Sequence, residues 1–321
     1  MKSDHIYDRL LPEIRKKIPK NSELVSTLTN ILFIEKEAVY RRLRNEVPFT
    51  FQEVVIISKQ LDISLDNMIG INTNRKRPFL LQMPDFLTPQ EIDYKMIEEL
   101  TVYLNAIKLE TDTEMGTISS ILPESMYCGF KNITQYYLFK WHYHYTNNTP
   151  SKAYHDIIAP EKVSESFRHF FDRSKNMKKT YFILDSQTFQ YLVNDIKYFN
   201  SIRLIKKEDI ANIKQDLERF LDYMEKIATT GKYEETGNQV LFYISDINID
   251  TGYSYIQSHN NRASLIWTFL LDSAVSFDEK TFTKMKTWFK SMTRTSTLIS
   301  VSGEKPRILF FEKQRKIISE L

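Results

Sequence analysis

Residues 22–70 read SELVSTLTNILFIEKEAVYRRLRNEVPFTFQEVVIISKQLDISLDNMIG, and this stretch decides the fold of the first part of the chain. Its apolar residues recur every three or four positions, the spacing that gathers side chains on one side of a helix. The pattern predicts short helices packed on a small common core. The expected helices cover residues 22–32, 35–45, 51–61 and 65–69.

Residues with known roles at helix ends mark the borders of these helices. Thr50 and Glu53 form the pattern of a capping box, in which each side chain binds the backbone N–H of the other residue. Pro48 ends the preceding helix, since the residue before a proline avoids helical backbone. Upstream, residues 6–18 predict one more helix, with Pro12 inside it as a possible kink.

The helix expected at 35–45 has one apolar and one polar side. At 100° per residue, Lys36, Glu37, Tyr40, Arg41 and Arg44 fall within an arc of about 140°. The apolar residues Val39 and Leu43 lie outside this arc, and Arg42 falls at its edge. Three cations, a tyrosine and a glutamate thus share the side that we expect to face solvent.

The stretch resembles the phage-repressor (Cro/repressor-type) helix-turn-helix DNA-binding domain over residues of about 20–70. The resemblance rests on the apolar spine Leu28, Ile34, Val39 and Leu43 and on the closing phrase Ile63-Ser-Leu-Asp66. Phe33 stands in the turn where the family usually has glycine. The resemblance implies that the second helix braces the third, whose outward residues reach base edges in the major groove of DNA.

This implication gives roles to five polar residues of the third helix. Arg41 and Arg44 would bind guanine O6 and N7, and Glu37 would accept a hydrogen bond from a cytosine amine. Tyr40 would contact a thymine methyl group or a phosphate, and Arg42 would bind phosphate or pair with an acid. The DNA-binding residues predicted are Lys36, Glu37, Tyr40, Arg41, Arg42 and Arg44. The alternative is that this basic side is merely solvated.

Composition and charge agree with a DNA-binding head on a larger neutral body. Residues 1–78 carry 14 Lys and Arg against 10 Asp and Glu, a net charge of +4, whereas the whole chain of 321 residues carries +3. The chain has 7 Gly and no glycine-rich phosphate loop, which argues against a Rossmann or P-loop architecture. A single cysteine, Cys128, excludes a disulfide within the chain and any cysteine-based zinc finger.

The remainder of the chain predicts an α+β domain. The expected fold class is an all-α helix-turn-helix domain at 1–70, a basic linker at 71–87 and an α+β domain with an antiparallel sheet at 88–321. Strands are expected at 117–129, 135–145, 180–184, 239–248, 253–259, 264–272 and 296–302. Helices are expected at 88–109, 161–173, 186–200, 207–228, 278–292 and 306–321, and residues 239–259 would form a hairpin.

Several residues of this domain have both a chemical and a structural interpretation. His142 and His144 would face one side of a strand and hold a metal, or belong to an aromatic sheet face. Acids at strand ends would serve acid–base chemistry or cap turns; these are Asp185, Asp246, Asp250 and Asp272. Cys128 would be a redox sensor or a buried thiol. The structural interpretations are preferred, so no catalytic residue, metal or cofactor is predicted.

Two features bear on partners. The stripe Met96, Leu100 and Leu104 is a dimer seam or a core face, and aromatic strands line a ligand pocket or fill the core. The expected function is that of a cytoplasmic DNA-binding transcription regulator, not an enzyme. The expected partners are double-stranded DNA, a second copy of the chain and a small-molecule effector, and no membrane partner is expected. The alternatives are a scaffold protein with a DNA-inert head, or an enzyme with an autoregulatory DNA-binding head.

Overall fold

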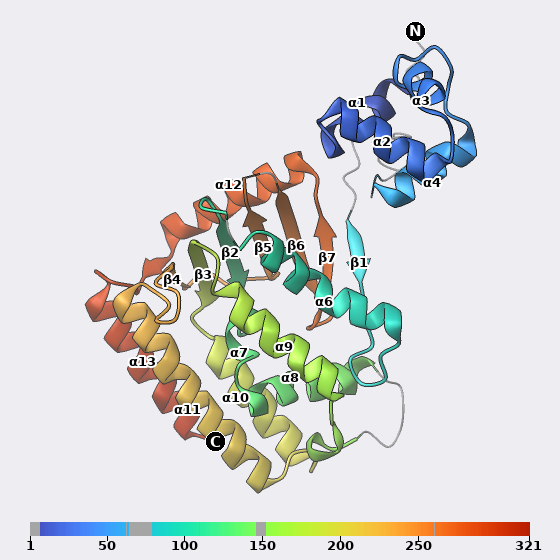
Figure 1. The fold of residues 1–321 in the computed structure, drawn as a ribbon. Coiled ribbons are helices and arrows are strands. Elements are labelled where there is room, and N and C mark those ends of the chain that lie inside the picture. The colour runs from blue at the N-terminus through green and yellow to red at the C-terminus, as the bar shows by residue number, and fades with distance from the viewer. Residues whose placement is uncertain (1–6, 62, 64–78, 109, 146–151, 260) are drawn as a thin grey trace. The chain divides into compact units, whose positions relative to one another are not determined.

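The computed structural model describes residues 7–61, 63, 79–108, 110–145, 152–259 and 261–321. The chain divides into two compact units, residues Met1–Pro78 and Phe79–Leu321 (Figure 1). Each unit has its own hydrophobic core, so each is described by itself.

The first unit is helical throughout its described part. Its helices are α1 (Tyr7–Lys17), α2 (Asn21–Leu32), α3 (Lys36–Leu43) and α4 (Phe51–Gln60). The expected apolar positions meet in one core that includes Leu10, Ile14, Leu24, Leu28, Val39, Leu43, Phe49, Ile57 and Ile63. The helix expected at 65–69 lies outside the described residues.

One of the expected helix-end signals is observed directly at the start of α4. The capping box at Thr50 forms as expected: Glu53 donates its N–H to Thr50 Oγ1 at 3.2 Å, and Thr50 donates its N–H to Glu53 Oε2 at 2.8 Å. Helix α1 continues through Pro12. Helix α2 ends where Phe33 turns into left-handed backbone.

The second unit is built on one mixed sheet of eight strands, in the order β1-β7-β6-β5-β2-β3-β4-β8. Strands β2, β3 and β4 run parallel to one another, whereas the other neighbours pair antiparallel. The strands are β1 (Leu80–Gln82), β2 (Glu114–Ser119), β3 (Lys179–Asp185), β4 (Gln239–Ser245), β5 (Tyr253–Gln257), β6 (Arg262–Thr268), β7 (Asp272–Ser276) and β8 (Thr297–Leu298). The α+β class is therefore correct, but the expectation of an antiparallel sheet is wrong, because helices connect β2 to β3 and β3 to β4 and return the chain in the same direction.

Helices cover both faces of this sheet (Figure 1). Helix α12 (Glu279–Thr295) packs on one face through Phe282 and Phe289. The other helices belong to the main core: α6 (Glu91–Ala106), α7 (Glu124–Tyr127), α8 (Lys131–Tyr145), α9 (Glu161–Ser174), α10 (Thr188–Ser201), α11 (Lys207–Thr230) and α13 (Glu304–Ser319), with a short 3₁₀ helix at Tyr154–Asp156. Within the described residues, no helix joins the length and the apolar character that crossing a bilayer requires.

Three expectations for the second unit need correction. The strand expected at 135–145 is helix α8. Its aromatic residues are buried on nearly every side, so the apolar positions show no helical period in the sequence. The hairpin expected across 239–259 does not form, since β2 and β3 lie between β4 and β5. The linker expected to reach residue 87 does not extend that far, because β1 pairs with β7 and Phe86 is buried.

Candidate functional site

Helix α3 follows α2 after a turn of three residues, and the two helices bury their facing sides. Phe33 adopts φ 54° and ψ 40°, the left-handed conformation that glycine favours, while its side chain is 92% exposed. Phe33 therefore has the backbone conformation that a glycine would adopt at this position. Leu28 of α2 and Val39 of α3 are fully buried, which leaves the opposite side of α3 open.

The open side of α3 carries the residues that the sequence indicated. Lys36, Glu37, Tyr40, Arg41 and Arg44 are all exposed. The helix has eight residues, and at 1.5 Å per residue it is about 12 Å long. This length is close to the width of the DNA major groove, about 12 Å.

Acidic neighbours partly neutralise this surface. Arg44 lies 3.2 Å from Glu37 and 2.7 Å from Glu46, and Arg41 lies 3.8 Å from Glu46. About half of each arginine side chain remains exposed. Exposed pairs of this kind contribute at most about 1 kcal/mol, so both guanidinium groups are available to a stronger anionic partner.

Arg42 is held inside the unit, away from the exposed residues. Its guanidinium donates to both carboxylate oxygens of Glu53, at 3.0 and 2.8 Å, and to the backbone oxygen of Ala38 at 3.2 Å. Burial alone would raise the pKa of Glu53, but the hydrogen bonds from Arg42 and Thr50 and the charge of Arg42 hold that pKa below its ordinary value. Of the two interpretations of Arg42, the pairing with an acid is the one observed.

The second unit contains a cavity of about 400 Å³ between α6, α9 and the sheet. The walls are mostly apolar; the residues of α6 and α9 in them are Met96, Ile97, Glu99, Leu100, Val102, Tyr103, Ala106, Ser166, Phe167 and Phe170. Val102 and Phe277 line the cavity and are also 63% and 56% exposed, so the cavity opens toward solvent beside them. Met96 and Leu100 line this space and Leu104 is buried, which agrees with the interpretation of this stripe as a core face.

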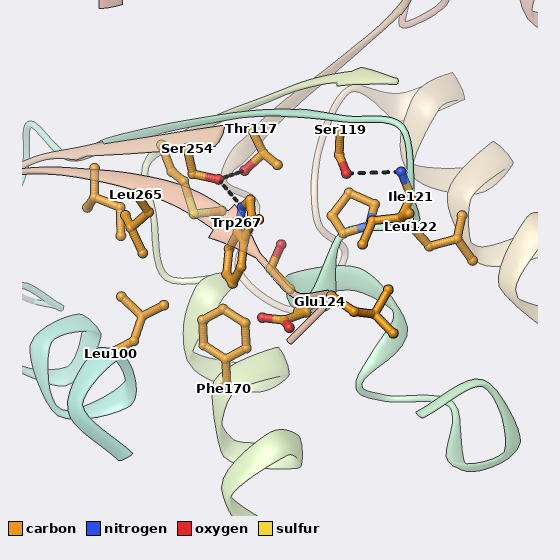
Figure 2. A pocket seen from close by; sticks show the side chains of 15 residues that line it. Leu100, Thr117, Ser119, Ile121, Leu122, Glu124, Phe170, Ser254, Leu265 and Trp267 are labelled. Atoms are coloured by element: carbon orange, nitrogen blue, oxygen red, sulfur yellow. Dashed lines mark hydrogen bonds between the residues drawn. The ribbon is translucent and has the colours of Figure 1, made fainter. Parts of the chain in front are cut away.

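A smaller chamber of about 20 Å³ adjoins the large one. The two chambers share the wall residues Leu100, Glu124, Phe170, Leu265 and Trp267. Hydroxyl groups line the small chamber: Ser254 Oγ lies 3.0 Å from Thr117 Oγ1 and accepts the indole N–H of Trp267 at 3.1 Å (Figure 2). These bonds fix the indole ring at the junction of the two chambers.

The acid at this junction is Glu124, at the start of α7. In Figure 2 its carboxyl group points toward the side of the pocket that Phe170 lines. Burial, and after it the negative charge of Asp272, raises the pKa of Glu124 to about 8. Burial likewise raises the pKa of Asp272 to about 6, although Trp141 donates a hydrogen bond to its Oδ2 at 3.4 Å.

Sequence reasoning missed Glu124 because residues 117–129 were expected to form one strand. The strand β2 ends at Ser119, and Pro123 leads into α7. The available signal was a lone acid among apolar residues directly after a proline. Asp272 was recognised as a strand-end acid, but its approach to Glu124 joins positions 148 residues apart, which no local pattern shows.

The other candidates have structural roles. His142 and His144 lie on α8, where residues two apart point to different sides, and no group of three or more potential metal ligands occurs among the described residues. Asp185 accepts the backbone N–H groups of Gln187 and Ile249. Burial raises the pKa of the Cys128 thiol well above its ordinary value, which suits a buried thiol better than a redox sensor.

Comparisons of the chain with protein-family models, with curated proteins and with solved structures give no match.

Proposed function

We propose that the protein is a cytoplasmic transcription regulator that reads a duplex operator through the exposed side of α3. The observation that carries this proposal is the composition of that side: Lys36, Tyr40, Arg41 and Arg44 point to solvent while Val39 and Leu43 pack behind them. A short helix braced in this way and rich in donors fits the manner in which recognition helices enter the major groove.

In this proposal the residues of α3 divide into two groups. Arg41 and Arg44 bind base edges or phosphates, exchanging the exposed carboxylates of Glu37 and Glu46 for DNA. Arg42 does not touch DNA and instead keeps α3 fixed to α4 through Glu53. The regulator would act as a homodimer, because two copies read two half-sites.

The proposal is tested by selecting bound duplexes from a random DNA pool with the full chain. We expect a symmetric enriched site, which would establish sequence reading and dimerisation together. The variants Arg41→Ala and Arg44→Ala should each weaken binding to that site by about 1–3 kcal/mol. The matched control is Arg294→Ala, an exposed arginine of α12, which should leave binding unchanged.

A scaffold with a DNA-inert head is the second candidate, and one observation favours it. Phe33 and Phe51 are 92% and 80% exposed, and exposed aromatic side chains of this size suit contact with a protein partner. The same selection separates the two functions. Because phosphate contacts strengthen steeply as salt is lowered, absence of DNA binding even at low salt would reject the regulator and leave the scaffold.

A further inference from the structure

The charges around the cavity of the second unit have one sign. Among the described residues that line the two chambers, the charged side chains are Glu99 and Glu124, and none is a lysine, arginine or histidine. The walls are otherwise apolar or carry hydroxyl and amide groups. An anionic ligand would meet a buried acid with no cation beside it, so the cavity suits a molecule that is apolar and positively charged.

The acid at the junction lacks a hydrogen-bonding partner in the described part of the chain. Among the described residues, no hydrogen bond or ion pair reaches the carboxyl group of Glu124. Oδ1 of the neighbouring Asp272 is also buried without a hydrogen bond within the described part of the chain. Carboxyl groups in poorly solvated positions are normally hydrogen-bonded or paired, so the carboxyl of Glu124, which lines both chambers, leaves room for a donor from outside.

The small chamber sets the size of that donor. A space of about 20 Å³ holds a group the size of one water molecule, and a primary ammonium is of that size, whereas a trimethylammonium is not. At the junction its N–H donors would find the carboxyl of Glu124. The rings of Phe170 and Trp267 add faces that attract a cation.

We propose that this cavity is a binding site for a hydrophobic primary amine. The apolar body of the amine occupies the large chamber beneath α6 and α9. The ammonium group lies at the junction with the small chamber, paired with Glu124. The large chamber thus accepts the apolar end of an amphipathic molecule, and the junction accepts its charged end.

The site is built partly from the segment that follows the first unit. Gln82, Pro84 and Phe86 line the large chamber, and they come directly after Pro78, where the first unit ends. An occupant of the cavity therefore contacts the segment that leads from the head into the sheet. Any effect of the amine on DNA binding rests on the proposed function, whereas its binding to the cavity does not.

The test uses three probes with the same apolar body: 4-phenylbutylamine, 4-phenylbutanol and 4-phenylbutyrate. Their binding to the full chain is measured by calorimetry and by tryptophan fluorescence, to which Trp267, a residue lining both chambers, contributes. We expect the amine to bind about tenfold or more tightly than the alcohol, and the carboxylate weakest, since hydrogen bonds to a charged partner are the strong ones. The amine carrying three N-methyl groups should lose most of this advantage.

Three variants decide where the amine binds. Glu124→Gln keeps the shape of the side chain and should remove the preference for the amine, while binding of the alcohol stays the same. Leu100→Trp fills both chambers and should weaken amine and alcohol alike. Glu91→Gln, an exposed acid of α6, is the matched control and should change nothing.

The outcomes separate cleanly. Equal affinity for all three probes, preference for the carboxylate, or an undiminished amine preference in Glu124→Gln would each overturn the proposal. Because Glu124→Gln removes a buried acid, it should fold at least as well as the parent, and thermal unfolding checks this. DNA binding is measured separately, so a failed amine test leaves the regulator proposal standing, and the reverse also holds.

Discussion

Arg42 of α3 and Glu53 of α4 form a two-point ion pair, with N–O distances of 3.0 and 2.8 Å. The same carboxylate accepts the backbone N–H of Thr50 and so completes the cap of α4. One glutamate therefore fixes the start of one helix and the position of another. The pair is mostly shielded from water, with 15% and 13% of the two side chains exposed.

Replacing Arg42 should therefore weaken the first unit more than replacing its exposed neighbour. We expect Arg42→Ala to lower the free energy of unfolding by about 1–3 kcal/mol, because it leaves the Glu53 carboxylate partly buried without its cation. Arg44→Ala, whose ion pairs are exposed, should cost less than about 1 kcal/mol. Hydrogen exchange of peptides covering α3 and α4 measures this in the full chain, where all three tryptophans lie in the second unit. Equal exchange in the two variants would contradict the role assigned to Arg42.

Phe33 adopts left-handed backbone, a conformation that its residue type disfavours. A non-glycine residue in left-handed backbone costs about 1–2 kcal/mol, and the Phe33 ring, 92% exposed, recovers little by burial. We expect Phe33→Gly to slow hydrogen exchange of α2 and α3, with a net gain of about 0.5–1 kcal/mol after the flexibility of glycine is subtracted.

Phe33→Ala is the control for that change. It removes the ring but keeps the strained backbone, so it should leave exchange close to that of the parent. If both variants lose DNA or protein binding while only the glycine variant gains stability, the ring serves contact and the strain is its cost. A glycine variant no more stable than the alanine variant would argue against the strain.

Glu46 is expected to restrain the affinity of α3 for DNA, provided that the proposed function holds. It lies 2.7 Å from Arg44 and 3.8 Å from Arg41, so an approaching phosphate must displace it. We expect Glu46→Gln to bind DNA about threefold to tenfold more tightly at low salt, with a smaller effect at high salt, because screening weakens exposed charge interactions. Glu23→Gln, an exposed acid of α2, is the control for net charge alone. Equal gains in both variants would show that Glu46 has no specific role.

The sequence predicted local features well and long-range ones poorly. The capping box at Thr50 and the exposed side of α3 depend on residues within a turn or two of each other, and their pattern carries the information. Helix α8 was mistaken for a strand because its aromatic residues are buried on nearly every side, which leaves no period to detect.

The order of the strands and the cavity acid lay beyond local patterns for a different reason. Strand β5 pairs with β2, across more than a hundred residues, so the neighbouring run in the sequence gave the wrong partner. Glu124 has no unusual local context except Pro123. Its raised pKa arises from burial and from the negative charge of Asp272, which the sheet brings near it.

That environment predicts an unusual dependence of stability on pH for the second unit. The pKa of Glu124 in the folded chain is about 8, above the ordinary value of 4.5. A carboxyl group with a raised folded pKa stabilises the fold while it is protonated, and this contribution is lost as the pH rises from about the unfolded value through the folded one. Stability of the parent should therefore fall, relative to Glu124→Gln, between about pH 5 and pH 8.5. With allowance for water in the cavity, we expect the difference in unfolding free energy to grow by about 2 kcal/mol.

Urea unfolding followed by tryptophan fluorescence measures this difference, since the tryptophans report on the second unit. Glu91 is an exposed acid of α6, so Glu91→Gln should follow the parent at every pH. Parallel curves for the parent and Glu124→Gln would mean that the carboxyl ionises in the folded chain as it does in water, and would contradict the raised pKa.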